Sequence, residues 1–456
     1  MEESNVNKSI KLLNATDIFV EYIMKLKQKP LPEKVSEKTK ECLLDFVGVT
    51  YAGACVNKER MQKVLSGDAG RCDVLGYNIK TVSREAAFIN ALNAHTAELD
   101  DGSRFGMIHL GAGIIPAVIA AAQEKELPYN SVIEGIIVGY EAAVRVSLAM
   151  QPGHKKRGFH TSGTCGLIGA AVGVACAMDC DRKQLKAVVS AAATSAAGLL
   201  EIQEDASTLK PYNLGHAAMA GLNAAYVGMA GFIGPEDILN GSRGMLRLLS
   251  DNQSVDKLAT ETDYYEIEQI YVKPYAACRH CHSAIEAILR LRDGFHIPTE
   301  DIIKIQIQTY EMAVRGHEHH NIYGIASAKL SMPFSVAAAY VLGTAGMEAF
   351  TEQTISNQTI IGLMSKVEVV VDPDMTVQAK SKRIAEVHIV TEAREESFRV
   401  DYAKGDPENP LSRDELIQKF ELLMEWSGRS QESMEIKRNI FVDYIKHSEK
   451  PKIYNS

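Results

Sequence analysis

Helical periodicity runs through the first half of the chain almost without strand alternation, and it narrows the folds that the chain can adopt. Between residues 18 and about 249, apolar side chains recur at spacings of three and four, most clearly over 40–54, 84–98 and 185–200. Residues 165–178 are rich in glycine and alanine, which let neighbouring helix backbones approach closely. This part of the chain therefore predicts a compact helical core.

Strand signals appear only after about residue 262. Four short segments are β-branched or alternate between apolar and polar side chains, and the last two predict a hairpin across a charged turn. These segments are 302–309, 366–371, 385–391 and 397–400. A smaller α+β domain is expected here.

Helical pattern returns near the C-terminal end. Ser412 followed by Glu415 fits a capping box, which predicts that a helix begins there and runs to about Trp426. We expect the last helices to pack back on the first domain, so the fold class is mainly α.

Composition excludes several classes of protein. The chain has 456 residues, 46% of them hydrophobic and 23% charged, which is typical of folded soluble proteins. A formal net charge of -9 gives no field that attracts nucleic acid or an anionic membrane surface. The N-terminus lacks the basic and apolar regions of a signal peptide, and the longest apolar stretches fall short of a membrane span. We therefore expect a cytoplasmic protein whose eight cysteines are reduced thiols.

Three local patterns could indicate a cofactor or a metal, and each favours a plainer interpretation. Cys278-Arg-His-Cys-His282 matches a haem attachment signature or half a zinc site, but no second pair of zinc ligands has the usual spacing. His317-Glu-His-His320 lacks the helical i, i+4 histidine pair of zinc peptidases. In Gly111-Ala-Gly-Ile-Ile-Pro116, proline replaces the last glycine of a dinucleotide loop. We expect the first motif to be a site loop in which His280 or His282 makes polar contacts. The second is expected to be a solvated loop, and the third the start of a helix.

An acidic segment stands at the end of a predicted helix. It contains Glu98, Asp100 and Asp101, and Arg104 and His109 follow. Carboxylates in such a position can orient a histidine or act as general bases, whereas the alternative is a solvated helix end with ion pairs to Arg104. The segment alone leaves both interpretations open.

Two basic loops precede predicted helices. His160 comes just before Thr161 and Ser162 at the start of a long apolar helix, and Lys210 precedes an alanine-rich helix. A helix N-terminus binds carboxylates through its free N–H groups, and a lysine adds a point charge. The two loops together predict a site for a small anion.

A series of short motifs spans nearly the whole chain. In order they are Leu44-Asp-Phe-Val-Gly48, His95-x-x-Glu98-Leu-Asp-Asp101, His109, Gly158-Phe-His-Thr-Ser-Gly163, Lys210-Pro-x-x-x-Gly215, Lys273-Pro-Tyr-x-x-Cys278-x-x-x-His282 and Asn409-Pro-Leu-Ser412. In these motifs and in their order the sequence resembles the MmgE/PrpD family.

The resemblance implies a large all-helical domain built from both chain ends, 1–264 with 402–456, and a smaller α+β lid domain over 265–401. It also implies a homodimer and a reaction without metal or organic cofactor. Known activities in the family are 2-methylcitrate dehydration, cis-aconitate decarboxylation and iminodisuccinate epimerisation. Each requires a carbanion-like centre next to a carboxylate, and hence a placed acid or base and cations that stabilise negative charge.

By resemblance, His109 and His160 would exchange protons, Lys210 and His282 would hold carboxylates, and Glu98 stands where the decarboxylase has an aspartate. Tyr310 and Tyr323 are candidates for the tyrosine of that site. The residues expected to bind substrate are Asp100, Asp101, Arg104, Thr161, Ser162, Arg279 and His280.

Glu98, Leu99 and Leu110 depart from the dehydratase and decarboxylase pattern. The chain is therefore expected to be a lyase for a small di- or tricarboxylate, with an epimerase of a small dicarboxylate or a non-catalytic carboxylate-binding protein as alternatives.

Overall fold

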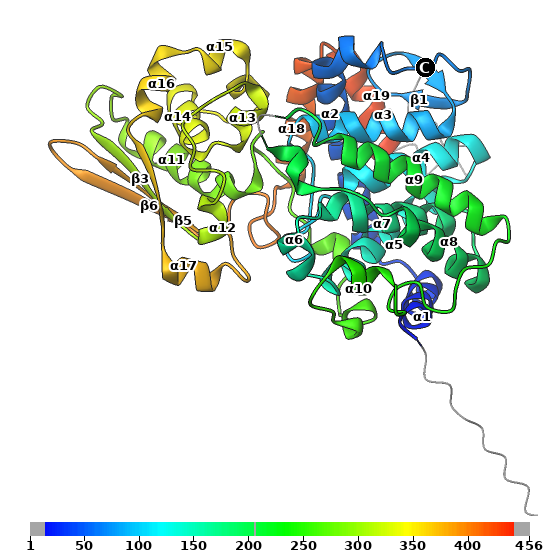
Figure 1. The fold of residues 1–456 in the computed structure, drawn as a ribbon. Helices are drawn as coiled ribbons and strands as arrows, with labels where there is room; N and C mark the ends of the chain where they lie inside the picture. Colours follow the sequence, from blue (N-terminus) through cyan, green and yellow to red (C-terminus); the bar gives the residue numbers. More distant parts are fainter. Residues whose placement is uncertain (1–13, 205–206, 442–456) are drawn as a thin grey trace, which may run out of the picture.

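The computed structural model describes residues 14–204 and 207–441; the remaining parts of the predicted domain ranges lie outside the described residues. Two bodies lie side by side (Figure 1): one is helical, and the other carries a four-stranded sheet with helices. The prediction of a mainly α fold with a minor α+β part is confirmed. Among the described residues, no helix combines the length and apolar character needed to cross a bilayer.

The helical body contains the elements that the periodicity predicted. Helix α7 packs on both α5 and α9, and α4 lies against all three. The helices of this body are α1 (Ala15–Gln28), α2 (Glu33–Met61), α3 (Ser83–Thr96), α4 (Gly111–Lys125), α5 (Tyr129–Leu148), α6 (Gly153–Lys156), α7 (Thr161–Ala177), α8 (Arg182–Ser195), α9 (Tyr212–Met229), α10 (Met245–Leu249), α18 (Arg413–Trp426) and α19 (Ser430–Phe441). The glycines at 111 and 113 open α4, as expected.

Glycines bring α5 and α7 into direct backbone contact. A Cβ atom added to Gly169 of α7 would lie 2.6 Å from the carbonyl oxygen of Gly139 on α5, and one added to Gly139 would lie 2.9 Å from the carbonyl oxygen of Gly169. Gly135 and Gly173 repeat this relation one turn away, with added Cβ atoms 2.7 and 2.6 Å from the opposite carbonyl oxygens. The small residues of 165–178 therefore allow the close approach of helix backbones that their composition predicted.

A short hairpin of the helical body was not predicted. Strands β1 (Cys72–Val74) and β2 (Ile79–Thr81) form an antiparallel hairpin between α2 and α3. Each has only three residues, so neither contains enough positions to show alternation in the sequence.

The sheet of the smaller body matches the predicted strands. Its order is β4-β3-β5-β6, with β3 parallel to β4 and antiparallel to β5, and with β5 and β6 forming the expected hairpin. α11 packs on β5 and β6, and α14 packs on β4. The strands are β3 (Lys304–Thr309), β4 (Val367–Val371), β5 (Ala385–Val390) and β6 (Glu395–Val400). The helices are α11 (His282–Phe295), α12 (Glu311–Val314), α13 (Ile325–Leu330), α14 (Met332–Leu342), α15 (Glu352–Ile355), α16 (Gln358–Met364) and α17 (Pro373–Gln378).

After the sheet the chain returns to the helical body, where α18 and α19 pack on α2 (Figure 1). The predicted capping box is present: Ser412 Oγ accepts from the Glu415 N–H, and the Glu415 carboxylate accepts from the Ser412 N–H over 2.7 Å. Both ends of the described chain therefore belong to one body.

Candidate active site

A cavity of about 580 Å³ opens where the two bodies meet, and both contribute to its walls. From the helical body come the loop after α3, the start of α7 and the turn before α9; from the smaller body come the turn before α11, the segment between α12 and α13, and Arg383. Predicted residues that line the cavity are Glu98, Arg104, His109, His160, Thr161, Ser162, Lys210, Arg279 and His280.

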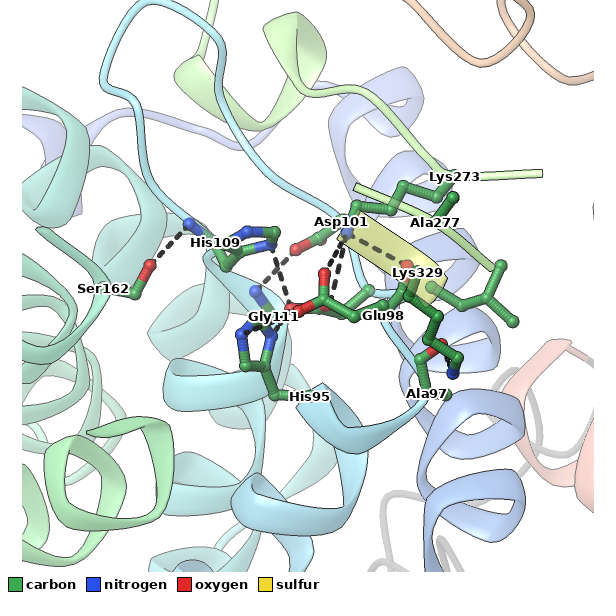
Figure 2. A network of polar contacts seen from close by, with 12 residues as sticks. His95, Ala97, Glu98, Asp101, His109, Gly111, Ser162, Lys273, Ala277 and Lys329 are labelled. Atoms are coloured by element: carbon green, nitrogen blue, oxygen red, sulfur yellow. Dashed lines mark hydrogen bonds and ion pairs between the residues drawn. The ribbon is translucent and has the colours of Figure 1, made fainter. Parts of the chain in front are cut away.

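The acidic segment after α3 holds two histidines together. Asp100 Oδ2 lies 2.9 Å from His95 Nδ1 and 3.2 Å from His109 Nδ1, and the two imidazole rings meet edge to face. The backbone N–H of His109 donates to Ser162 Oγ over 3.0 Å, which ties the segment to α7 (Figure 2). Asp100 thus orients His109 from behind, as the sequence suggested for a carboxylate in this segment.

Burial keeps His109 neutral. It lowers the pKa of His109 to about 4, because the Asp100 carboxylate, which favours the charged form, is outweighed by desolvation and by the opposing charge of Lys273. Burial would raise the pKa of Asp100, but His95 and His109 hold it well below its usual range. At neutral pH an uncharged imidazole therefore stands beside an ionised carboxylate.

Glu98 is shared by two lysines. Its backbone has a φ of 55°, a left-handed conformation that is uncommon outside glycine. The carboxylate pairs with the Lys210 ammonium through Oε1 and lies 3.2 Å from Lys273 Nζ through Oε2 (Figure 2 shows the second contact). Burial would raise the pKa of Glu98, but Lys210 and Lys273 hold it well below its usual range. An ionised carboxylate of this kind is a weak base and fixes the position of Lys210.

The start of α7 supplies His160. This residue is the N-cap of the helix, and the side-chain amide of Asn213, on α9, donates to its Nδ1 over 2.8 Å. Burial lowers the pKa of His160 well below its usual range, and the Lys210 charge lowers it further. Since Nδ1 accepts a hydrogen bond, the proton of the neutral ring lies on Nε2.

Three of the predicted residues face away from the cavity. Asp101 accepts from Tyr140 Oη over 2.6 Å and from the Gly111 N–H over 2.7 Å, so it stabilises the start of α4; burial raises its pKa to about 7. His282 is buried at the start of α11 with Nε2 3.1 Å from the Ala277 carbonyl oxygen. Asp100 lies behind His109. None of these three side chains lines the cavity, so their expected contact with substrate stays a prediction.

Arg104 and Arg279 lie on either side of a buried carboxylate. Arg279 Nη2 lies 2.6 Å from Asp406 Oδ1, Arg104 Nη1 lies 3.6 Å from the same atom, and Arg104 also pairs with Glu408. The Nε and Nη1 atoms of Arg279 have no hydrogen-bond partner among the described residues. Arg279 lines the cavity, while these two nitrogens are buried.

Sequence reasoning missed three cations of the cavity wall, Lys155, Arg315 and Arg383, of which Arg315 pairs with Glu311. Lys155, on α6, has no carboxylate within ion-pair distance in the part of the chain that the structure describes. Arg383 is buried, and its partners among residues 14–204 and 207–441 are backbone carbonyls, those of Ala379, Lys382 and Arg104. The basic run 153–157 was a signal for Lys155, whereas Arg383 stands in no motif.

One group of side chains could hold a metal ion within 14–204 and 207–441: His95, Asp100 and His109 each offer a ligand atom within 4.8 Å of the others. Lys273 Nζ lies 3.9 Å from Asp100 Oδ1 and would repel a cation there. The Cys278 and His317 patterns do not form such a group. Instead they meet, with Cys278 Sγ 3.1 Å from His317 Nε2.

Comparison with known proteins places this site in a family. The model of the MmgE/PrpD N-terminal domain matches residues 17–258, and that of the MmgE/PrpD C-terminal domain matches residues 275–440. The chain belongs to the MmgE/PrpD family. The resemblance read from the loop motifs is therefore confirmed.

Similar MmgE/PrpD proteins include two from distant organisms. Cis-aconitate decarboxylase of Homo sapiens is 21% identical over 434 residues, which covers 90% of this chain and 87% of the human protein. Cis-aconitate decarboxylase-like protein oryM of Aspergillus oryzae is 26% identical over 301 residues, which covers 62% of each chain. The match therefore spans less than two thirds of the fungal protein but most of the human one.

Proposed function

We propose that this protein is a cofactor-independent lyase that acts on a small di- or tricarboxylate by moving a proton next to a carboxylate. The observation that carries the proposal is the pair His109 and His160. Both rings are neutral, both line one cavity, and the groups beside their Nδ1 atoms, the Asn213 amide and the Asp100 carboxylate, favour opposite roles for their Nε2 atoms.

His109 is proposed as the base. Asp100 Oδ2 stands beside Nδ1, so the ring carries its proton there and leaves the lone pair of Nε2 for a proton of the substrate. A base must be unprotonated when substrate binds, and a pKa of about 4 meets that requirement at neutral pH. Asp100 then stabilises the imidazolium that forms.

His160 is proposed as the proton donor. With Nδ1 occupied by Asn213, Nε2–H is available to a leaving hydroxyl or to a carboxylate oxygen that gains charge. Lys210 and the N-terminus of α7 add positive potential at the same place. Removal of a proton or of carbon dioxide next to a carboxylate leaves negative charge that these groups stabilise.

The remaining cations of the cavity account for a second carboxylate. Lys155, Arg279 and Arg383 line the wall contributed by α6 and the smaller body, and each keeps donors or charge that the described residues do not fully neutralise. A substrate with two or three carboxylates would be held at both ends. The cis-aconitate decarboxylase relatives, whose substrate is a tricarboxylate, agree with this expectation.

A second candidate, an epimerase of a small dicarboxylate, is favoured by the same pair of neutral histidines. An epimerase removes a proton from one face of a carbon and returns one to the other, so it needs two groups that flank the substrate. The tautomers favour the lyase, because Nε2 of His160 already carries a proton.

The test is proton NMR of the purified protein with methylcitrate, cis-aconitate, citrate and iminodisuccinate in deuterated water. A lyase releases water or carbon dioxide from one of them; an epimerase exchanges the α proton with inversion and loses neither. His160→Ala and Lys210→Ala should abolish the reaction, and unchanged activity in both would disprove the site. Binding without any turnover would instead identify a non-catalytic carboxylate-binding protein.

A further inference from the structure

Cys278 and His317, which no sequence pattern pairs, form a dyad in the cavity wall. Cys278 Sγ lies 3.1 Å from His317 Nε2, and His317 Nδ1 lies 3.0 Å from the carbonyl oxygen of Arg315. Both residues line the cavity. Neither has a part in the proton transfers proposed above.

Backbone hydrogen bonds hold both partners in place. The N–H of Cys278 donates to the Lys329 carbonyl over 2.8 Å. The N–H of His317 donates to the Val314 carbonyl over 2.9 Å, and its own carbonyl accepts from the Met332 N–H over 2.8 Å. The short distance between sulfur and imidazole therefore belongs to a fixed arrangement of the two loops.

The hydrogen bonds also set the tautomer of His317. Because Nδ1–H donates to a carbonyl oxygen, Nε2 is the nitrogen that can take the thiol proton. A nucleophile, a base within hydrogen-bond reach and a third group that orients the base are the parts of an activated cysteine site.

The charge around the dyad favours the thiolate. Burial would raise the pKa of Cys278, but His317 outweighs it and Lys210 adds to the effect against the opposing charge of Glu98, so that the pKa falls to about 6. Burial would lower the pKa of His317, but the Cys278 thiolate raises it. Elsewhere in the described chain, burial alone raises the pKa of the Cys165 thiol to about 12. Cys278 is thus unlike an ordinary buried cysteine.

We propose that Cys278 is a nucleophile that captures unsaturated carboxylates in the cavity, with His317 as its base. The thiolate bonds to the β carbon of a conjugated alkenoate, and the π electrons move to the α carbon. The His317 imidazolium returns the proton it took from sulfur to that carbon. The sum is addition of S–H across C=C, with no other reactant.

This inference rests on the proposed function only in taking a small carboxylate as the ligand. The cations Lys155, Lys210, Arg279 and Arg383 would hold the carboxylate of the alkenoate in reach of sulfur. The thioether would then occupy the cavity, so an unsaturated acid of this class would switch the enzyme off.

The test compares charged and neutral alkylating agents, with the modified cysteine found by peptide mass spectrometry. Iodoacetate and iodoacetamide form the first pair, acrylate and acrylamide the second. Cys55, which is exposed, is the internal reference. A cationic cavity raises rates for anions by roughly 10- to 1000-fold, so the ratio of iodoacetate to iodoacetamide rates at Cys278 should exceed that at Cys55 by at least about tenfold. Acrylate should show the same preference, and equal ratios at the two cysteines would overturn the proposal.

Two variants separate the dyad from general exposure of the thiol. Cys278→Ser should remove the fast modification, and His317→Gln should slow it by about tenfold or more while labelling of Cys55 stays unchanged. Fast labelling that survives in His317→Gln would contradict the role of the base. These rates need no turnover, so their failure is distinguishable from failure of the lyase proposal.

Discussion

The side-chain amide of Asn213 donates a hydrogen bond to Nδ1 of His160 over 2.8 Å and so assigns the proton of the neutral ring to Nε2. His109 has the reverse arrangement, because the carboxylate of Asp100 stands beside its Nδ1. Two histidines of one cavity thus differ in tautomer because of the neighbours behind them. In the proposed mechanism that difference makes one histidine the acid and the other the base, although both are the same residue type.

Asn213→Asp should reverse the tautomer of His160. The new carboxylate would accept from Nδ1–H and leave Nε2 without its proton. Loss of the correct tautomer lowers kcat by roughly 100-fold or more, with a smaller change in KM. Steady-state kinetics and the pH profile check this, since the carboxylate also raises the pKa of His160. Wild-type kcat with an unchanged profile would show that Asn213 does not set the tautomer.

The acid limb of kcat/KM should lie near pH 4. His109 must be neutral to act as a base, and its pKa in the folded protein is about 4 where an ordinary histidine has about 6.5. The active form therefore persists as pH falls below 6.5 and is lost only as pH passes through about 4. A limb near pH 6.5 would contradict His109 as the base.

The same pKa shift predicts acid sensitivity of the fold. Between about pH 6.5 and pH 4 an unfolded His109 takes up a proton that the folded one refuses, so stability falls as pH drops through this window. Thermal unfolding of His109→Gln should lose part of the pH dependence that the wild type shows there. If the unfolding temperatures of both proteins depend equally on pH in this window, the lowered pKa of His109 is refuted.

Lys155→Met should weaken substrate binding. Loss of a hydrogen bond to a charged carboxylate costs about 1.5–3 kcal/mol, which corresponds to a rise in KM of about 10- to 100-fold with a smaller effect on kcat. Lys156→Met is the matched control, because Lys156 is the next residue of α6 and is exposed. Equal effects of the two variants would remove Lys155 from the site.

Turnover should continue after treatment with a chelator and dialysis. The group that could ligate a metal, His95, Asp100 and His109, lies beside Lys273, whose charge opposes a cation. Metal analysis of the active protein with kinetics before and after EDTA checks this. Loss of activity that Zn²⁺ or another divalent ion restores would contradict a cofactor-free mechanism.

Most of the fold was predictable from local sequence patterns. The capping box of Ser412 and Glu415 involves neighbours in sequence, and the strands 385–391 and 397–400 show their alternation within themselves, so both were predictable. β1 and β2 were not, since three residues each are too few for a periodic signal. The parallel pairing of β3 with β4 joins residues about sixty positions apart, which no local pattern encodes.

The site, too, contains residues that local sequence patterns predict and others that they do not. His109 and Glu98 were predictable because they stand in one short polar segment. The direction of a side chain was not: Asp101 turns towards Tyr140, and His282 turns into the base of α11. Cys278 and His317 are 39 residues apart, and only the folding of two loops reveals that they touch.

The close contact of Gly139 with Gly169 fixes the position of α7, and His160 is the N-cap of this helix. As the N-cap of α7, His160 lies about 14 Å along the helix axis from Gly169, at roughly 1.5 Å per residue. A methyl group at Gly169 would clash with the Gly139 carbonyl oxygen and force α7 to shift or tilt. Directed evolution of this enzyme should therefore find that alanine at Gly169 impairs turnover although it touches no ligand. Substitutions at this pair could therefore move His160, the proposed proton donor, without changing any residue that lines the cavity.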